Sequence, residues 1–398
     1  MTAFAVQYLE DASGIAPDDA RAKLRAALEQ LPIARVLLGW NVPDLLADVC
    51  RDETKRAGAQ LFRWHLLLAG DGAFVPRPEW RTIGLQGEPA PGFENMPEFT
   101  FVCPNRPAVR EAVLDHLRQT MKRGGYDGLF LDRIRFPSPA ADPTRWLACF
   151  CDDCRRAASE VGLDLEPARK RIGRLLANPG RVRSCAQTLL GSRSESAEPD
   201  LALLEAFLDF RERSVSEFVR PAAALIHAEG LAVGLDCFSP SLARMVGQDL
   251  SALDACADWI KVMTYGHTLG PAGLPFELLA LAGWLIEKQS LGETQVLGWL
   301  SQASGLPLPL TRADLRARGL PPAALFAEIK RARAARVRTL LAGIELVEIE
   351  GITHLEPAQI EADVRAFREA GADGLVLSWD LRHIPIERLQ RVGAIWIV

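Results

Sequence analysis

The sequence predicts an α/β protein, a (β/α)8 barrel with insertions after the fourth and sixth strands. Short apolar runs alternate with segments of helical period along most of the chain. Eight such apolar runs fit within the 398 residues. No G-x-G-x-x-G follows the first run, as it normally would in an open doubly wound sheet. We therefore expect one catalytic domain over residues 1–398.

The first half of the chain supplies four of these strands. They are expected at residues 4–10, 35–41, 61–68 and 128–135. Apolar positions spaced by three and four residues predict helices between them, at residues 18–30, 45–55 and 106–122. Residues 70–100 are rich in Gly and Pro, which indicates a long loop before the last of these helices.

The regular alternation breaks twice in the second half. Residues 137–200 carry a cysteine cluster and short helical runs, and residues 267–322 are rich in loops. We interpret both as insertions and expect them to cover the C-terminal face of the barrel. The remaining strands are expected at 231–237, 259–265, 338–346 and 374–379, with helices at 201–229, 278–288, 323–335, 357–370 and 386–392.

Composition excludes several classes of protein. The net charge is −5 and no basic block is present, so a nucleic-acid partner is not expected. No apolar stretch approaches the ~20 residues of a membrane span. The N-terminus has no basic region before an apolar run, so no signal peptide is expected. We predict a cytoplasmic protein without a membrane partner; homo-oligomerisation is left open.

Four cysteines have the spacing of metal ligands. Three of them lie within six residues and one lies far upstream, and four thiolates can surround one tetrahedral zinc ion. The predicted ligands of this structural zinc are Cys103, Cys149, Cys151 and Cys154. A redox pair at Cys151 and Cys154, or four buried free thiols, are the alternatives. No organic cofactor is expected.

Three carboxylates close predicted strands, and barrel enzymes place their chemistry at the C-terminal ends of strands. They are Asp132, Asp236 and Glu345. Glycoside hydrolysis needs two carboxylates, one protonated as the acid and one ionised as nucleophile or base. We expect Asp132 to be the nucleophile or a stabiliser of the transition state, while Asp236 and Glu345 compete for the acid/base role. Gly234 and Gly343 would leave interior room below the last two.

Aromatic and polar side chains accompany these acids at the strand ends. Aromatic faces cover sugar rings, and Arg, His and Asn bind their hydroxyls. The predicted substrate-binding residues are Trp40, Asn41, His65, Arg133, Arg135, Lys261, Tyr265, His267, Trp379 and Asp380. Structural ion pairing is the alternative for the two arginines, and packing is the alternative for His65. We expect one cavity to be lined by Trp40, His65, Asp132, Asp236, Tyr265, Glu345 and Trp379.

The stretch from Cys103-Pro104-Asn105 to Cys149-x-Cys151-x-x-Cys154 resembles the zinc-bearing segment of family 42 β-galactosidases. The resemblance covers roughly residues 100–155 and implies a structural zinc next to the active-site end of a barrel that binds carbohydrate. In that family the fourth strand ends in Asn-Glu, whereas here it ends in Leu131-Asp132-Arg133. If the family 42 arrangement held, Glu345 would be the nucleophile.

Two segments instead resemble other sugar-cleaving barrels. An aspartate followed by arginine is similar to the fourth strand of amylase-like and α-galactosidase-like barrels, where the aspartate is the nucleophile. Val262-Met263-Thr264-Tyr265 is similar to the sixth strand of chitinase-like barrels. We predict a glycoside hydrolase acting on an oligosaccharide or small glycoside. A carbohydrate-binding barrel without turnover and a non-glycosidic barrel hydrolase are the alternatives.

Overall fold

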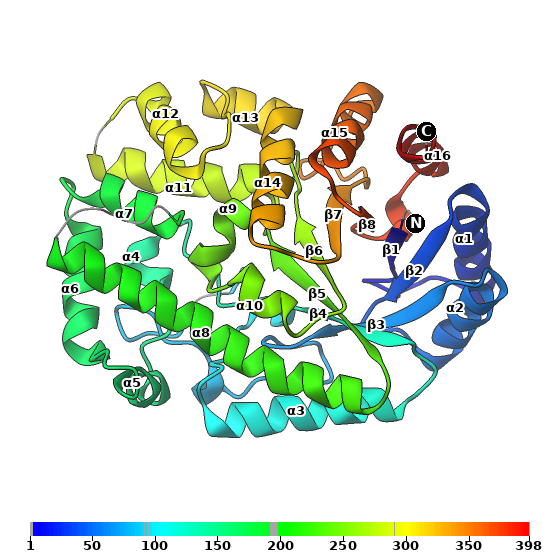
Figure 1. Cartoon of the computed structure of the whole chain (residues 1–398), viewed down its shortest axis with the longest axis horizontal. Coiled ribbons are helices and arrows are strands. Elements are labelled where there is room, and N and C mark those ends of the chain that lie inside the picture. The colour runs from blue at the N-terminus through cyan, green and yellow to red at the C-terminus, as the bar shows by residue number, and fades with distance from the viewer. Residues whose placement is uncertain (1–2, 91, 94–95, 192–197, 290, 398) are drawn as a thin grey trace.

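Eight parallel strands close into a barrel in chain order (Figure 1). The computed structural model describes residues 3–397 except 91, 94–95, 192–197 and 290. Every strand pairs with the next one in parallel, and β8 returns to β1 through pairs from Ala3–Gly374 to Val6–Leu377. The predicted fold class, a (β/α)8 barrel, is confirmed.

All eight strands overlap the predicted ones. Their bounds are Ala3–Tyr8 (β1), Ile33–Leu38 (β2), Gln60–Leu66 (β3), Gly128–Asp132 (β4), Ala232–Phe238 (β5), Trp259–Met263 (β6), Leu340–Glu345 (β7) and Gly374–Ser378 (β8). The fourth strand ends three residues earlier than predicted, because Arg133 has a φ of 54° and leaves the extended conformation.

Helices surround the barrel, and several begin with a proline in the first turn, where no intrahelical partner for its N–H is needed. The helices up to β5 are Pro17–Gln30 (α1), Asp44–Arg56 (α2), Pro107–Lys122 (α3), Pro143–Trp146 (α4), Asp152–Ser159 (α5), Leu165–Ala177 (α6), Val182–Leu189 (α7) and Pro199–Ala228 (α8). The later ones are Pro240–Ala243 (α9), Leu250–Asp254 (α10), Leu274–Gln289 (α11), Glu293–Ser304 (α12), Arg312–Arg318 (α13), Pro322–Ala334 (α14), Pro357–Ala370 (α15) and Ile386–Trp396 (α16). None of the described helices combines the length and apolar character of a membrane span.

Side chains fill the interior of the barrel. Because successive strand residues point to opposite faces, alternate positions supply this inner cluster, which includes Ala5, Leu37, Phe62, Trp64, Phe130, Trp259, Leu341 and Val376. The rings of Phe130 and Trp259 stack at 5.1 Å. A Cβ atom on Gly234 would lie 2.2 Å from the Trp259 ring. The room that we expected Gly234 to leave for Asp236 is therefore occupied by Trp259.

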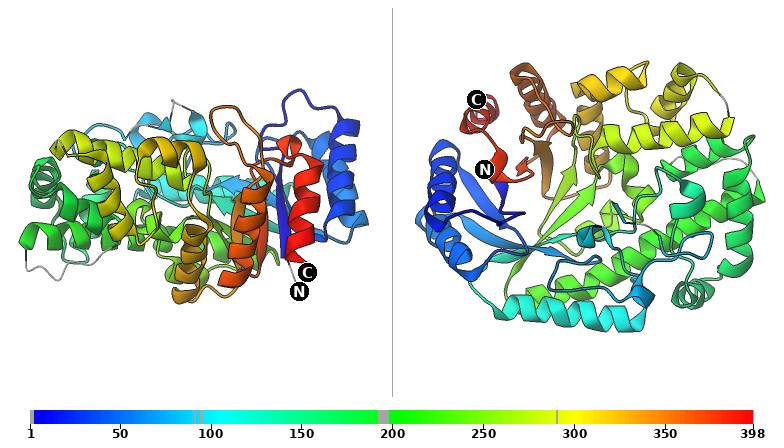
Figure 2. Two further views of the ribbon diagram at one scale, coloured as in Figure 1. Left: turned by 90° about the horizontal axis from the view of Figure 1, so that it is seen from above. Right: turned by 180° about the vertical axis from the view of Figure 1, so that it is seen from behind.

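The longest excursions from the barrel follow β4 and β6. Helices α4 to α8 lie between β4 and β5, and α11 to α14 lie between β6 and β7. Helix α7 packs against α11 and α12. The two groups of helices consequently lie together at one side of the barrel (Figures 1 and 2). The limits of the insertions, 137–200 and 267–322, stay predictions.

Candidate active site

A cavity of about 550 Å³ opens at the C-terminal ends of the strands. Its polar lining includes Glu10, Asp132, Arg133, Arg135 and Asp236. Its aromatic lining consists of Trp64, Phe93, Phe99, Tyr265, Phe276 and Trp379. This end of a (β/α)8 barrel is where barrel enzymes carry out their chemistry. We call this space the central cavity.

Asp132 is the last residue of β4 and is buried. Its carboxylate accepts hydrogen bonds from Trp64 Nε1 at 3.1 Å and from Arg133 Nη1 at 2.6 Å, and also from the backbone N–H of Arg133. Burial alone would raise the pKa of Asp132, but the Arg133 guanidinium, the hydrogen bonds and Lys261 outweigh it and hold that pKa below its ordinary value. Asp132 is therefore ionised at neutral pH.

Asp236 lies on the neighbouring strand, β5, and is also buried. Its Oδ2 accepts a hydrogen bond from Lys261 Nζ at 2.9 Å. Its Oδ1 has no hydrogen-bond partner among the described residues. Burial raises the pKa of Asp236 to about 7 against the pull of Lys261, and the negative charge of Asp132 adds to the rise. Two neighbouring carboxylates thus have pKa values pushed in opposite directions.

Lys261 lies beneath the cavity and is not among its lining residues. Besides Asp236, its ammonium donates a hydrogen bond to Gln7 Oε1 at 3.0 Å. A Cβ atom on Gly343 would lie 2.8 Å from Lys261 Cε. The glycine that we expected to leave room for Glu345 therefore leaves room for this lysine.

Glu10 is a third acid of the central cavity, and the sequence interpretation did not select it. It follows β1, and burial raises its pKa to about 7, opposed by the charge of Arg133. The backbone N–H groups of Leu9 and Glu10 donate to the carboxylate of Asp380 at 2.9 and 3.0 Å. Asp380, a predicted substrate-binding residue, thus holds the end of β1 and does not line the cavity. The position of Glu10 just after the first strand was the available signal.

Aromatic rings and guanidinium groups form the walls. Tyr265 and Trp379 pack edge to face, with ring centroids 6.2 Å apart. The Arg133 guanidinium lies 4.5 Å from the Phe99 ring centroid. Arg135 lies 4.6 and 4.5 Å from two further rings, those of Phe101 and Phe238. Burial lowers the pKa of Arg135 to about 9. Both guanidinium groups that line the cavity therefore lie against aromatic rings.

The central cavity continues into a smaller one. This second space has a volume of about 170 Å³ and shares Phe93, Phe99, Arg135 and Phe276 with the first. Pro137, Ser138 and Trp146, at the start of the excursion after β4, line its far side. The beginnings of both excursions reach the site, since Leu269 and Pro271 line the central cavity.

His65 and Trp40 lie in a different place from the one expected. They line a separate cavity of about 90 Å³ beside α3, so the prediction that they share the central cavity is wrong. On β3 successive side chains alternate, and Trp64 points to the barrel interior while His65 points to Thr120 of α3. Trp64, which the sequence interpretation passed over, is the residue that lines the site. Because adjacent strand residues point to opposite faces, selecting His65 in place of Trp64 placed the predicted side chain on the wrong side of β3.

Glu345 is also absent from the lining of the central cavity, against the prediction. It is buried, accepts a hydrogen bond from the backbone N–H of His267, and has a pKa raised by burial to about 7. His267 bonds to Asp363 at 2.9 Å through Nε2 and to the Arg318 carbonyl at 2.9 Å through Nδ1.

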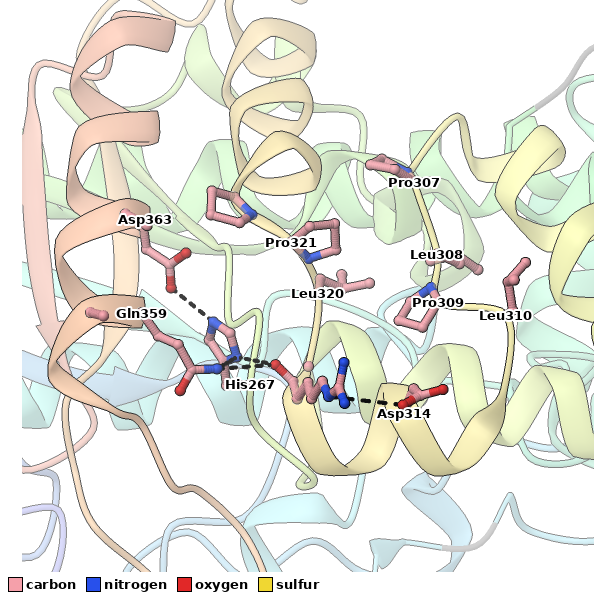
Figure 3. A pocket seen from close by; sticks show the side chains of 15 residues that line it. His267, Pro307, Leu308, Pro309, Leu310, Asp314, Leu320, Pro321, Gln359 and Asp363 are labelled. Carbon is pink, nitrogen blue, oxygen red and sulfur yellow. Dashed lines mark hydrogen bonds and ion pairs between the residues drawn. The ribbon is translucent and has the colours of Figure 1, made fainter.

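His267 lines a different, largely apolar cavity of about 620 Å³ with Leu308, Leu310 and Leu320 (Figure 3). Despite burial, the bond to Asp363 raises the pKa of His267 to about 9. Asn41, another predicted binding residue, is exposed, and its amide lies beside Gly72, where a Cβ atom would be 3.0 Å from Asn41 Nδ2.

The four cysteines with ligand spacing come together. Their sulfur atoms all lie within 4.8 Å of one another, and the Cys103 sulfur lies 3.5 Å from that of Cys151 and 3.4 Å from that of Cys154. A tetrahedral zinc ion with Zn–S bonds of ~2.3 Å needs sulfur atoms ~3.8 Å apart. The backbone N–H of Ile83 donates to the sulfur of Cys149 at 3.3 Å. The side-chain Nδ2 of Asn105 donates to the sulfur of Cys154, also at 3.3 Å. The donor set fits a tetrahedral metal ion whose thiolates are held by outer N–H groups.

Three solved structures that share this fold are glycoside hydrolases. The glycoside hydrolase domain of PgaB (BpsB) from Bordetella bronchiseptica matches with 13% identity over 98% of both chains and a TM-score of 0.61. A β-galactosidase from Marinomonas ef1 matches with 12% identity over 100% of this chain and 59% of its own, at a TM-score of 0.57. The β-amylase catalytic domain of Paenibacillus polymyxa matches with 11% identity over 100% and 97%, at 0.54.

The sequence itself matches no protein-family model and no curated protein. At these low identities, the likeness to solved structures establishes the fold that this chain shares with them. The chemistry has to be argued from the site.

Proposed function

We propose that this protein is a glycoside hydrolase and that the central cavity is its active site. One observation carries the proposal: an ionised Asp132 at the end of β4 and a protonatable Asp236 near the end of the neighbouring strand β5 line one aromatic-walled cavity. Glycoside hydrolysis requires one ionised and one protonated carboxyl group on either side of the scissile bond. The glycoside hydrolases of the same fold support the proposal.

The proposed roles follow from the surroundings of each carboxyl group. Asp132 receives three hydrogen bonds, so it keeps its charge and serves as nucleophile, base or stabiliser of the positive transition state. Asp236 is the proposed acid. Its Oδ1 is buried and has no partner among the described residues, and a proton there removes a charge that burial disfavours. Glu10, the other acid with a raised pKa in the cavity, is the competing proton donor.

The proposed substrate is an oligosaccharide or small glycoside. The central cavity of about 550 Å³ and its extension of about 170 Å³ share a row of aromatic rings along which successive sugars can lie. Arg133 and Arg135 offer guanidinium donors for hydroxyl groups.

We also propose that the four cysteines bind a structural zinc ion, as the resemblance to family 42 β-galactosidases implies. Cys103 ends the loop that brings Phe93 and Phe99 to the central cavity, and the other three ligands belong to the excursion after β4. The ion would hold these two segments together and take no part in the reaction.

The test is a screen of aryl glycosides with wild-type protein, Asp132→Asn and Asp236→Asn. We expect both variants to fold normally. Asp132→Asn should lose about 10³-fold or more in kcat on the glycoside that wild type cleaves, and Asp236→Asn should lose turnover in proportion to the need of the leaving group for a proton. Asp115→Asn on the exposed face of α3 is the matched control and should keep full turnover. If Glu345→Gln is inactive while Asp132→Asn turns over normally, the family 42 arrangement replaces ours. Sugar binding without cleavage of any glycoside would establish a binding barrel instead.

A further inference from the structure

A second group of metal-ligating side chains lies between β3 and α3, outside the central cavity. His65 belongs to β3, Asp71 to the loop that follows, and His116 to α3. One ligand atom from each lies within 4.8 Å of the others, and the three line the cavity of about 90 Å³ described above. None of them has a role in the proposed hydrolysis.

One ring nitrogen of His65 has no hydrogen-bond partner among the described residues. It is 1% exposed, and its Nδ1 lies 3.5 Å from Thr120 Oγ1. The Thr120 hydroxyl donates its hydrogen to the His116 carbonyl at 3.1 Å, so towards His65 it can only accept. The proton of His65 therefore sits on Nδ1, and the lone pair is on Nε2. That Nε2 is buried and has no hydrogen-bond partner among the residues that the structure describes.

A buried lone pair without a donor is unfavourable, and a bound cation would satisfy it. An imidazole nitrogen with a free lone pair is the form in which histidine ligates metals.

Asp71 is held in the orientation of a ligand. It is 5% exposed, its Oδ1 accepts a hydrogen bond from the Phe74 backbone N–H at 2.6 Å, and its Oδ2 lies 2.7 Å from His116 Nε2. Metal-binding carboxylates and imidazoles are commonly fixed by such outer hydrogen bonds.

We propose that His65, Asp71 and His116 bind a divalent transition-metal ion of the Zn²⁺ type. The ligands are His65 Nε2, one oxygen of Asp71 and His116 Nε2, with the His116 proton moved to its Nδ1. Two imidazoles and one carboxylate form a familiar protein ligand set that leaves one coordination position open. The adjoining small cavity offers room for a water molecule or a small anion in that position.

Two arginines, Arg63 and Arg123, also line this cavity and bring positive charge near the fourth position. Arg63 directs its guanidinium to the Trp40 carbonyl and to the Tyr126 hydroxyl. Arg123 lines the cavity and favours an anionic fourth ligand, because it adds a positive charge beside the ion.

A metal ion at His65, Asp71 and His116 would also stabilise the loop that follows β3. Asp71 stands at the start of the loop after β3, and Cys103 stands at its end. The same loop carries Phe93 and Phe99 into the central cavity. An ion at Asp71 would fix the first end of this loop as the cysteine cluster fixes the last.

The experiment is a Co²⁺ titration of the full chain after metals have been removed with a chelator. Four thiolates give Co²⁺ intense charge-transfer absorption in the near ultraviolet, whereas nitrogen and oxygen ligands give only weak visible bands. We expect a second ion per chain to bind with weak visible bands and no added charge-transfer intensity. Uptake at the thiolate site alone would overturn the proposal.

Variants assign the second ion to its ligands. His116 is 16% exposed on its helix, so His116→Ala should fold normally. It should weaken the second site by more than about 100-fold, since even outer partners of a metal site contribute about 10–100-fold. Asp71→Asn should act in the same direction. Gln119→Ala, which changes another lining residue of the same cavity, is the control and should bind as wild type does. Equal binding of the second ion by His116→Ala and wild type would refute the assignment.

Discussion

The surroundings of Asp132 and Asp236 give two identical side chains opposite properties. Asp132 accepts hydrogen bonds from Trp64 and Arg133, whereas Asp236 keeps one buried oxygen without a described partner. Both aspartates are visible in the sequence as residues that close strands. Their difference depends on Trp64 and on the φ of 54° at Arg133, neither of which a strand pattern reveals.

The first prediction concerns pH. Because the pKa of Asp236 is raised to about 7, the proposed acid is protonated below pH 7 and loses its proton above it. The kcat/KM of the wild type should therefore fall as pH rises through about 7. The acidic limb, set by Asp132, should lie below the usual aspartate pKa of about 3.9.

Lys261→Met sharpens this prediction. Lys261 lowers the pKa of Asp236, so its removal should move the basic limb of the pH profile to higher pH. Asp236 would then remain neutral in its buried position. A basic limb that stays in place in this variant would show that another group, with Glu10 the first candidate, supplies the proton.

At the scale of single elements, strands and helices followed closely from the sequence, while the contents of loops did not. Apolar periodicity locates all eight strands, and alternation decides which side chains enter the barrel. The same alternation places Trp64 inside the barrel and His65 on the side of α3. The sequence interpretation selected His65 as the substrate-binding residue, and Trp64 is the one that lines the site. The roles of Phe93 and Phe99 could not be predicted, because they lie in a Gly- and Pro-rich loop. A loop has no periodicity that would indicate which of its side chains point to the site.

A substitution at Gly234 of β5 tests the packing of side chains inside the barrel. Gly234→Ala would place a methyl group 2.2 Å from the Trp259 ring, and neither the ring nor the strand can move freely. We expect the free energy of unfolding to fall by about 1–3 kcal/mol or more. Gly298→Ala, in α12 with open space around it, is the control and should raise the free energy of unfolding by roughly 0.5–1 kcal/mol. Chemical denaturation measures both, and an unchanged Gly234→Ala would contradict the interior packing.

A substitution in the cysteine cluster tests whether a metal ion there stabilises the segments that the cysteines join. Cys151→Ser should lower Tm and reduce the metal content by about one ion per chain, because a structural ion contributes its binding energy to folding. Cys256→Ser, at a buried cysteine outside the cluster, is the control and should keep the metal. Elemental analysis and thermal unfolding are the measurements. A Cys151→Ser protein with wild-type Tm and metal content would rule out a structural zinc.

At the scale of the whole molecule, the closed barrel followed from the number of strands and their alternation with helices. The side-by-side packing of α7 with α11 and α12 did not, because it joins segments about a hundred residues apart that carry no shared pattern (Figure 1). We expected both excursions to cover the barrel. The described residues of the excursions that line the central cavity lie near β4 and β6, the last of them Phe276 in the first turn of α11, while α7, α11 and α12 pack together at the side of the barrel.

The central claim is that Asp132 and Asp236 together cleave a glycosidic bond. The most direct test compares kcat for two glycosides of the same sugar, one with an activated aryl leaving group and one with a sugar leaving group. Asp236→Asn should lose far more turnover on the second, because only that leaving group needs a proton, while Asp132→Asn should lose about 10³-fold or more on both. Near-normal turnover of Asp132→Asn on both substrates would contradict the claim.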